Sequence, residues 1–184
     1  PAAAAPAKFD FWFGLSGDLA RVVDTMCKNF NESQSDFEVV CTSQGDYDTT
    51  LQNTIAAFRA GKQPTVVQVY DVGTATMMLS GAVLPVYQLL AEQGFKIDWK
   101  DFIAPVVGYY SKDGNLYSMP FNSSTPILYY NKDQFARAGL DPNRPPQTWK
   151  QVEEYSKKLI GSGAAKCGFS TGWPSWTMVE NMHA

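Results

Sequence analysis

The chain has 184 residues, of which 45% are hydrophobic and 14% aromatic, enough for one full domain with a core, or for one domain and part of another. Its formal net charge is −3, without long runs of one sign, so neither nucleic acid nor an anionic membrane is expected as a partner. No apolar stretch approaches the roughly 20 residues of a membrane span.

Side chains suited to catalysis or metal binding are few. His183 is the only histidine and the cysteines are dispersed, so neither a histidine-based triad nor a metal site is predicted. Nothing in the spacing of Asp46, Asp48 and Asp71 demands a catalytic acid/base pair. We therefore predict no cofactor, no metal and no enzymatic activity.

Residues 1–8 are rich in alanine and lack the basic start and the large apolar centre of a signal peptide. They are expected to form a tail. Their composition resembles the remnant of a removed export signal, and a cloning junction or a simple linker fits it equally well.

Three segments of the first half have the character of strands: residues 8–13, 37–42 and 65–70. The third is a β-branched run typical of a buried parallel strand. Residues 112–115, Lys-Asp-Gly-Asn, lie between two extended segments and predict a hairpin turn.

Helical patterns lie between these strands. Ser16 can cap a helix whose apolar residues recur at helical spacing. Its apolar face is Leu19, Val22, Val23, Met26 and Phe30. A second helix, marked by Leu51, Ile55 and Phe58, is expected to stop at Gly61, and shorter helices are predicted at 74–80 and 86–92. The alternation predicts an α/β sheet with crossover helices.

A hydroxyl-rich link, the Asn-Ser-Ser-Thr-Pro of residues 122–126, separates two apolar extended runs. Such a link suits a crossing between two lobes that hold a polar ligand. The predicted organisation is a tail (1–8), a first lobe (9–121), the crossing (122–126) and the start of an incomplete second lobe (127–184).

Within the second lobe, strands are predicted at 127–130 and 167–170, with a short helix ending at Gly139. Thr148 and Gln151 have the spacing of a capping box and begin a longer helix. The residues expected to be buried by that helix are Trp149, Val152, Ser156, Leu159 and Ile160.

Cys27 lies on the first predicted helix and Cys41 on the strand that follows it. A bridge between these neighbouring elements is sterically possible, and an exported location would favour it. The alternative is that both are small buried apolar residues. The sequence alone favours this second interpretation.

Several residues lie where an α/β cleft would need them, beyond the carboxyl ends of the strands. The amides of residues 14–17 face a helix N-terminus and could meet an anion, although a plain helix cap is the preferred interpretation of Ser16. Tyr47 and Asp71 follow the second and third strands, and a surface-loop role explains them equally well.

The link and the second lobe contribute further candidates. Ser124 belongs to the crossing, and Trp173 and Trp176 follow the last predicted strand. Aromatic side chains can stack on a sugar or glycerol face or enclose a choline-like cation. Both tryptophans could equally be core anchors.

Residues 56–61, 68–78 and 120–133 together resemble the periplasmic substrate-binding proteins of ABC importers for glycerol-3-phosphate and glycerophosphodiesters. The similarity runs from about Phe9 to the end of the chain. The Tyr-Asn-Lys-Asp of residues 130–133 and a Pro-Pro-x-Thr-Trp motif mark the broader superfamily of maltose-type binding proteins. The resemblance implies an α/β, type II periplasmic binding protein-like fold with two lobes, here apparently truncated.

The resemblance implies a ligand role for Tyr47, for Asp71 where relatives have glutamate, and for Ser124. It implies that Trp173 is the aromatic platform, with Trp176 close by. The first loop departs from the family pattern, because residues 12–17 read Trp-Phe-Gly-Leu-Ser-Gly where relatives have Trp-His-x-x-x-Gly. This departure implies an altered ligand preference. The family's cationic phosphate partner, an arginine, has no obvious counterpart in this chain.

By resemblance, the function is capture of sn-glycerol-3-phosphate or of glycerophosphodiesters such as glycerophosphocholine by hinge closure. The expected partners are membrane permease subunits and their ATPase, and the expected state is a periplasmic monomer. The alternative is an oligosaccharide receptor of the maltose type, and a phosphodiester or glycoside hydrolase is less favoured. These 184 residues alone are expected to bind glycerol phosphates weakly or not at all.

Overall fold

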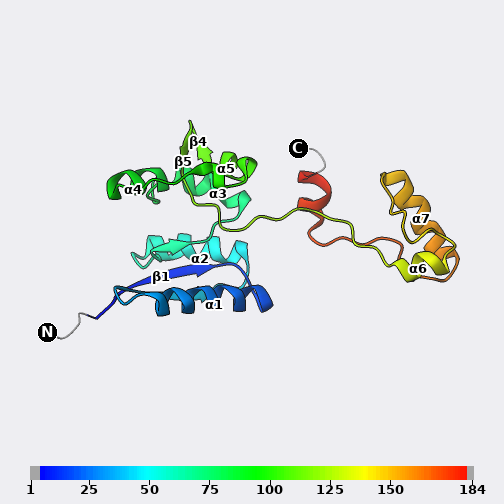
Figure 1. The fold of residues 1–184 in the computed structure, drawn as a ribbon, viewed down its shortest axis with the longest axis horizontal. Helices are drawn as coiled ribbons and strands as arrows, with labels where there is room; N and C mark the ends of the chain where they lie inside the picture. Colours follow the sequence, from blue (N-terminus) through cyan, green and yellow to red (C-terminus); the bar gives the residue numbers. More distant parts are fainter. Residues whose placement is uncertain (1–4, 182–184) are drawn as a thin grey trace. The chain divides into compact units, whose positions relative to one another are not determined.

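A computed structural model describes residues 5–181 of the chain (Figure 1). The chain divides between Ser123 and Ser124 into two compact units. Unit 1 ends at Ser123 and unit 2 begins at Ser124. Among the described residues, none of the helices combines the length and the apolar character needed to cross a membrane.

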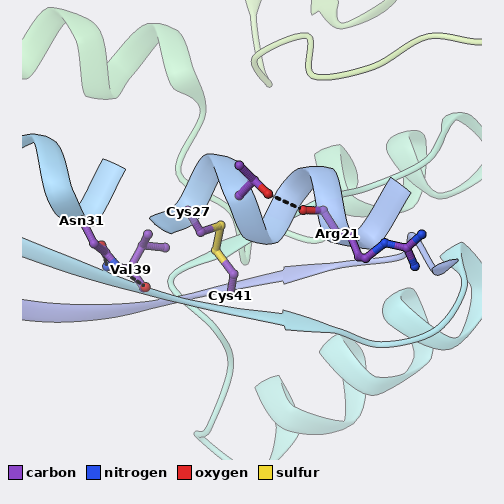
Figure 2. Close-up of a disulfide and its surroundings, with 6 residues drawn as sticks. Arg21, Cys27, Asn31, Val39 and Cys41 are labelled. Carbon is purple, nitrogen blue, oxygen red and sulfur yellow. Dashed lines mark hydrogen bonds between the residues drawn. A yellow bond between two sulfur atoms is a disulfide. The ribbon is translucent and has the colours of Figure 1, made fainter. Parts of the chain in front are cut away.

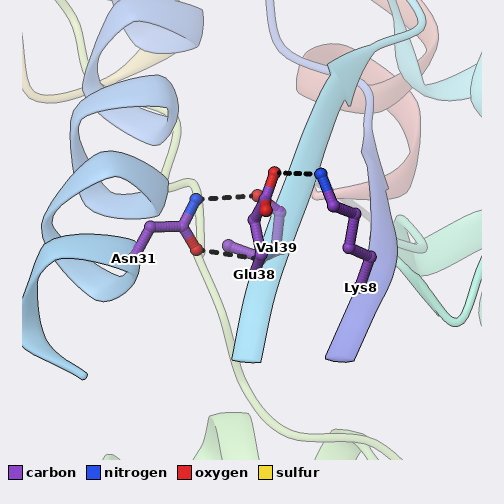
Figure 3. Close-up of polar contacts among 4 residues, drawn as sticks. All are labelled: Lys8, Asn31, Glu38 and Val39. Atoms are coloured by element: carbon purple, nitrogen blue, oxygen red, sulfur yellow. Dashed lines mark hydrogen bonds and ion pairs between the residues drawn. The ribbon is translucent and has the colours of Figure 1, made fainter. Parts of the chain in front are cut away.

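Unit 1 is built on a parallel sheet with the strand order β2-β1-β3. The strands are β1 (Ala7–Phe13), β2 (Phe37–Ser43) and β3 (Val66–Val67). β1 begins at Ala7, one residue before the predicted strand of residues 8–13, and Lys8 forms an ion pair of 2.9 Å with Glu38 of β2 (Figure 3). β3 is shorter than the strand predicted over residues 65–70, since only Val66 and Val67 pair with β1.

Two helices lie on opposite sides of this sheet, α1 (Gly17–Ser33) and α2 (Tyr47–Arg59) (Figure 1). The last two turns of α1 are fastened to β2 by polar and covalent bonds. The Asn31 side chain accepts from the Val39 N–H at 2.8 Å and donates to the Val39 carbonyl at 3.0 Å (Figure 3). Cys27 and Cys41 form a disulfide (Figure 2). The interpretation of these cysteines that the sequence favours, a reduced buried pair, is therefore wrong.

The predicted apolar face of α1 is only partly buried. Val23 is 3% exposed, whereas Leu19 and Val22 are 60% and 56% exposed. The helix forms where its periodicity predicts it, but the neighbours among the described residues cover one strip of it. The buried hydrophobic side chains of unit 1 are Phe13, Val23, Val39 and Leu116.

The rest of unit 1 consists of short elements. They are α3 (Asp71–Leu79), α4 (Val86–Gln93), a 3-10 turn η1 (Trp99–Asp101), α5 (Ala104–Tyr109), β4 (Ser111–Lys112) and β5 (Asn115–Leu116). β4 and β5 are antiparallel. The turn between them has positive φ angles of 54° at Asp113 and 76° at Gly114, as a tight two-residue hairpin turn requires. The predicted hairpin is confirmed.

Unit 2 contains α6 (Lys132–Arg137), α7 (Trp149–Gly161) and a π-helical turn η2 (Ser175–Glu180). Its small core consists of Phe135, Leu140 and Leu159, packed against Tyr130 and Tyr155 among others. The predicted strands at 127–130 and 167–170 do not form. An extended segment becomes a strand only when another strand takes up its backbone hydrogen bonds, and unit 2 has no assigned strand among its described residues.

Helix α7 begins where the capping box predicts. The Thr148 hydroxyl accepts from the Gln151 N–H at 3.2 Å. The Gln151 side chain accepts from the N–H of Gln147, one residue earlier than the usual box. The predicted burial is wrong at both ends of the helix, since Trp149 and Ile160 are 49% and 52% exposed.

Candidate ligand-binding site

Unit 1 brings two of the predicted ligand residues to the carboxyl-terminal edge of its sheet. Tyr47 is the first residue of α2 and Asp71 the first residue of α3, and these helices follow β2 and β3. A helix N-terminus carries partial positive charge and unpaired N–H groups, so this edge favours polar and anionic ligand groups.

Aromatic stacking and one short hydrogen bond position Tyr47. Its ring stacks on that of Tyr70, with 5.7 Å between centroids and 15° between planes. The Tyr70 hydroxyl in turn donates to Asp48 Oδ1 at 2.5 Å. This hydrogen bond, together with burial and nearby negative charge, raises the pKa of Tyr70 to about 12. The stack is therefore anchored at the Tyr70 ring by the Asp48 carboxylate.

Asp71 is half-buried and is bonded through both its side chain and its main chain. Its Oδ1 accepts from the Val72 N–H, and its backbone carbonyl accepts from the Tyr109 hydroxyl, both at 2.9 Å. Burial is the first cause that raises the pKa of Tyr110, followed by the charges of Tyr109, Asp71 and Tyr47. Tyr47 and Asp71 thus act on the same tyrosine and belong to one neighbourhood.

One amide of the first loop is occupied within unit 1, and contact of residues 15–17 with an anion stays a prediction. The Gly14 N–H donates to Gln68 Oε1 at 2.9 Å, so this amide is already used inside unit 1. A Cβ atom on Gly14 would lie 2.8 Å from the Asp46 carbonyl and from the Tyr47 ring. Glycine at this position lets the loop pass directly against the start of α2.

Ser16 occupies the N-cap position of α1, but its side chain makes no capping hydrogen bond. Only its backbone carbonyl participates, accepting from the Ala20 N–H at 3.4 Å. The cap interpretation is therefore right in position and wrong in chemistry. The ligand role of Ser16 stays a prediction.

Two residues that sequence analysis missed connect this edge. Gln68 is 8% exposed, and its Nε2 donates to Asn122 Oδ1 at 2.7 Å. Asn122 Nδ2 then donates to the Tyr47 hydroxyl oxygen at 3.0 Å. One signal was available: Gln68 interrupts the run Val66-Val67-Gln68-Val69, and a polar side chain in a buried strand needs partners.

The remaining aspartates of this edge have structural partners. Asp46 caps α2 by accepting from the Thr49 N–H and hydroxyl at 2.8 and 3.0 Å, which lowers the pKa of its carboxyl group. Asp48 accepts from Tyr70. Within residues 5–181, no three His, Cys, Asp or Glu side chains are grouped so that they could hold a metal ion. The chemistry that this edge offers is hydrogen bonding.

The predicted residues of unit 2 are mostly open to solvent. Ser124 is exposed, Trp173 is 73% exposed, and Trp176 is half-buried. The two indole rings meet edge-on, with centroids 6.5 Å apart. Trp173 is therefore not a core anchor, and its φ of +46° is unusual for a residue other than glycine. His183 lies outside the described residues.

A comparison with protein families matches residues 16–184 to the model of the bacterial extracellular solute-binding proteins. The sn-glycerol-3-phosphate-binding periplasmic protein UgpB of Escherichia coli (strain K12) is 49% identical over 176 residues. The protein of the same name from Salmonella paratyphi A is 47% identical over 176 residues. Each alignment covers 95% of this chain and 40% of the relative, so the chain spans about two fifths of the length of these proteins.

Solved structures agree with this match. UgpB from Mycobacterium tuberculosis in complex with glycerophosphocholine superposes with a TM-score of 0.76 and 28% identity, over 87% of this chain and 41% of that one. The structure of CpMnBP1 with mannotriose bound has a TM-score of 0.69 at 21% identity, over 83% of this chain and 38% of that one. The second likeness concerns the fold alone.

Proposed function

This chain belongs to the bacterial extracellular solute-binding proteins, and from that premise we propose that it is part of the solute-binding component of an ABC importer. Its ligand is sn-glycerol-3-phosphate or a glycerophosphodiester such as glycerophosphocholine. The observation that carries this proposal is the identity of 49% to sn-glycerol-3-phosphate-binding proteins across 95% of the chain.

The edge of unit 1 supports a ligand of this kind. A glycerol phosphate carries hydroxyl groups, which donate, and phosphate oxygens, which accept. Asp71 supplies a carboxylate for the hydroxyl groups, and Tyr47 supplies a phenol. The exposed Trp173 and Ser124 of unit 2 are proposed to complete the contacts, with the indole ring covering the glycerol or choline group.

We extend the proposal to mechanism and surroundings. Residues 122–126 serve as the crossing about which closure captures the ligand, and the liganded protein then delivers it to permease subunits driven by an ATPase. The protein acts as a periplasmic monomer without catalysis. The Cys27–Cys41 disulfide supports an exported location, because such bonds persist in oxidising compartments.

Calorimetry tests the proposed ligand. The full product of the gene that encodes this chain is titrated with glycerol-3-phosphate, glycerophosphocholine and maltose. We expect one or both glycerol phosphates to bind and maltose to give no heat of binding. Binding of maltose alone would replace this proposal by an oligosaccharide receptor.

The isolated 184-residue chain is a matched sample for the same titration. We expect it to bind glycerol phosphates weakly or not at all, because a phosphate favours a cationic partner and the predicted ligand residues include no lysine or arginine. Micromolar binding by this chain would contradict that expectation.

A separate assay tests for an enzyme. Hydrolysis of glycerophosphocholine that is lost in the variant Asp71→Asn would identify a hydrolase instead of a binding protein.

A further inference from the structure

We propose that Gln68 and Asn122 set the direction of hydrogen bonding at Tyr47, so that its hydroxyl group meets the ligand as a donor. This inference rests on the proposed function and deepens it. It assigns two positioning residues to the site. It also names the ligand group that Tyr47 selects, an acceptor-only oxygen such as that of a phosphate.

The direction is set at Gly14. A backbone N–H can only donate, so the Gln68 side-chain atom 2.9 Å from it is the oxygen, Oε1. The Gln68 amide nitrogen is then on the other branch and donates to Asn122 Oδ1 at 2.7 Å. The opposite orientation of Gln68 would place two donors against each other, and Gln68 is too buried for water to compensate freely.

The same logic passes through Asn122 to Tyr47. Since Asn122 Oδ1 accepts from Gln68, its Nδ2 is the branch that donates to the Tyr47 oxygen at 3.0 Å. A phenol has one hydrogen, and this bond does not use it. Three hydrogen bonds therefore run in one direction from Gly14 to Tyr47, and bonds in such a series strengthen one another.

The consequence is chemical selection. A hydroxyl group that already accepts from an amide is a better donor, so Tyr47 favours a ligand oxygen with no hydrogen of its own. Phosphate oxygens satisfy this condition, and an ammonium group does not. The Tyr47–Tyr70 stack holds the ring that carries the hydroxyl group.

One isosteric substitution, Gln68→Glu, reverses the last two bonds of the series and leaves Tyr47 itself unchanged. In Gln68→Glu, a carboxylate accepts from the Gly14 N–H and needs a second donor, so the Asn122 amide turns over. Asn122 Oδ1 then takes the Tyr47 hydrogen. We expect the affinity of the full gene product for glycerophosphocholine, measured by calorimetry, to fall about 10- to 100-fold.

A double-mutant cycle with Tyr47→Phe separates this effect from direct repulsion by the new charge. If Gln68 acts through the Tyr47 hydroxyl group, Gln68→Glu weakens binding in the parent and has little effect in the Tyr47→Phe background. Equal losses in both backgrounds would overturn the proposal. The loss should also shrink as pH falls, because the protonated carboxyl group can donate again, whereas the phosphodiester keeps its charge.

A measurement without ligand keeps this test independent of the proposed function. In the parent, nuclear Overhauser contacts should join the Asn122 side-chain NH₂ to the Tyr47 ring, and Gln68→Glu should abolish them. If Gln68→Glu does not fold, Asn122→Asp is the second variant, with the same expected loss of affinity. If the parent shows no nuclear Overhauser contact between Asn122 and Tyr47, the proposed series of hydrogen bonds from Gly14 to Tyr47 is overturned. Contacts in the parent without binding of either glycerol phosphate would overturn the proposed function and leave the series in place.

Discussion

Two regions of unit 1 are held together by different means. Where α1 packs on β2, the contact is fastened by the Cys27–Cys41 disulfide and by the two hydrogen bonds of Asn31 (Figures 2 and 3). The second region is the carboxyl-terminal edge of the sheet, which carries Tyr47 and Asp71 and is called the ligand edge below. Here side-chain hydrogen bonds and a tyrosine stack hold the elements together. The first region holds the fold together, and in the second the hydrogen bonds direct the Tyr47 hydroxyl group toward a ligand. Substitutions in the two regions should therefore separate stability from binding.

The largest loss of stability is expected from removing the disulfide. It joins residues 14 apart in sequence, and closing a loop of about that size stabilises a fold by about 3 kcal/mol. The double variant Cys27→Ala, Cys41→Ala should lose this amount of unfolding free energy in urea, while its affinity for glycerophosphocholine stays at the parental value. A parallel drop in affinity would show that the two regions are coupled.

Asn31→Leu should be the next most damaging change. It leaves the N–H and carbonyl of Val39 without their side-chain partner, which we expect to cost about 2 kcal/mol. Asn31→Asp is the matched control, because it keeps the acceptor for the Val39 N–H and loses only the donor. The urea midpoint of this control should lie between those of the parent and Asn31→Leu, and equal midpoints for both variants would refute a role for the N–H bond.

Gly14→Ala tests the ligand edge. The new methyl group would lie 2.8 Å from the Asp46 carbonyl and from Tyr47, so the start of α2 must shift. We expect a loss of about 1 kcal/mol in stability together with a clear loss of affinity, in contrast to the cysteine variant. Gly108→Ala is the control, because a methyl group there meets nothing within 4 Å. Parental affinity in Gly14→Ala would mean that the position of Tyr47 does not matter for binding.

The elements that sequence analysis predicted best are those with strong local patterns. α1, α2 and the 112–115 turn form where expected, because periodicity and turn residues act over a few positions. Strand formation depended on partners: residues 8–13 and 37–42 pair with each other, whereas 127–130 have no assigned partner in unit 2 and stay irregular. An apolar extended run predicts the tendency to form a strand, and pairing decides the outcome.

The candidate site shows the same division. Tyr47 and Asp71 could be named because each follows a predicted strand and matches a family motif. Gln68 and Asn122 were missed because their hydrogen bond joins residues 54 apart, and no local pattern connects them. The Cys27–Cys41 bridge was judged wrongly for a related reason, since the packing of α1 on β2, not the spacing of the cysteines, brings the two sulfur atoms together.

The smallest effect on stability is expected from Tyr70, which stacks on Tyr47, and this effect depends on pH. Hydrogen bonding to Asp48 raises the pKa of Tyr70 from its ordinary value of 10.0 to about 12. Because the folded-state pKa is the higher one, Tyr70 stabilises unit 1 fully below about pH 10, and this contribution disappears as pH rises through 12. Tyr70→Phe should therefore be about 0.5 kcal/mol less stable than the parent near neutral pH, and the difference should vanish toward pH 12. Ultraviolet absorbance is titrated with pH in the parent and in Tyr70→Phe, and the difference between the two curves isolates the ionisation of Tyr70. When the same difference is measured in an Asp48→Asn background, its midpoint should move down toward 10, because the charged acceptor is lost. A midpoint near 10 already in the parent would mean that Asp48 does not hold the stack, and that the ligand edge relies on Asn122 alone to place Tyr47.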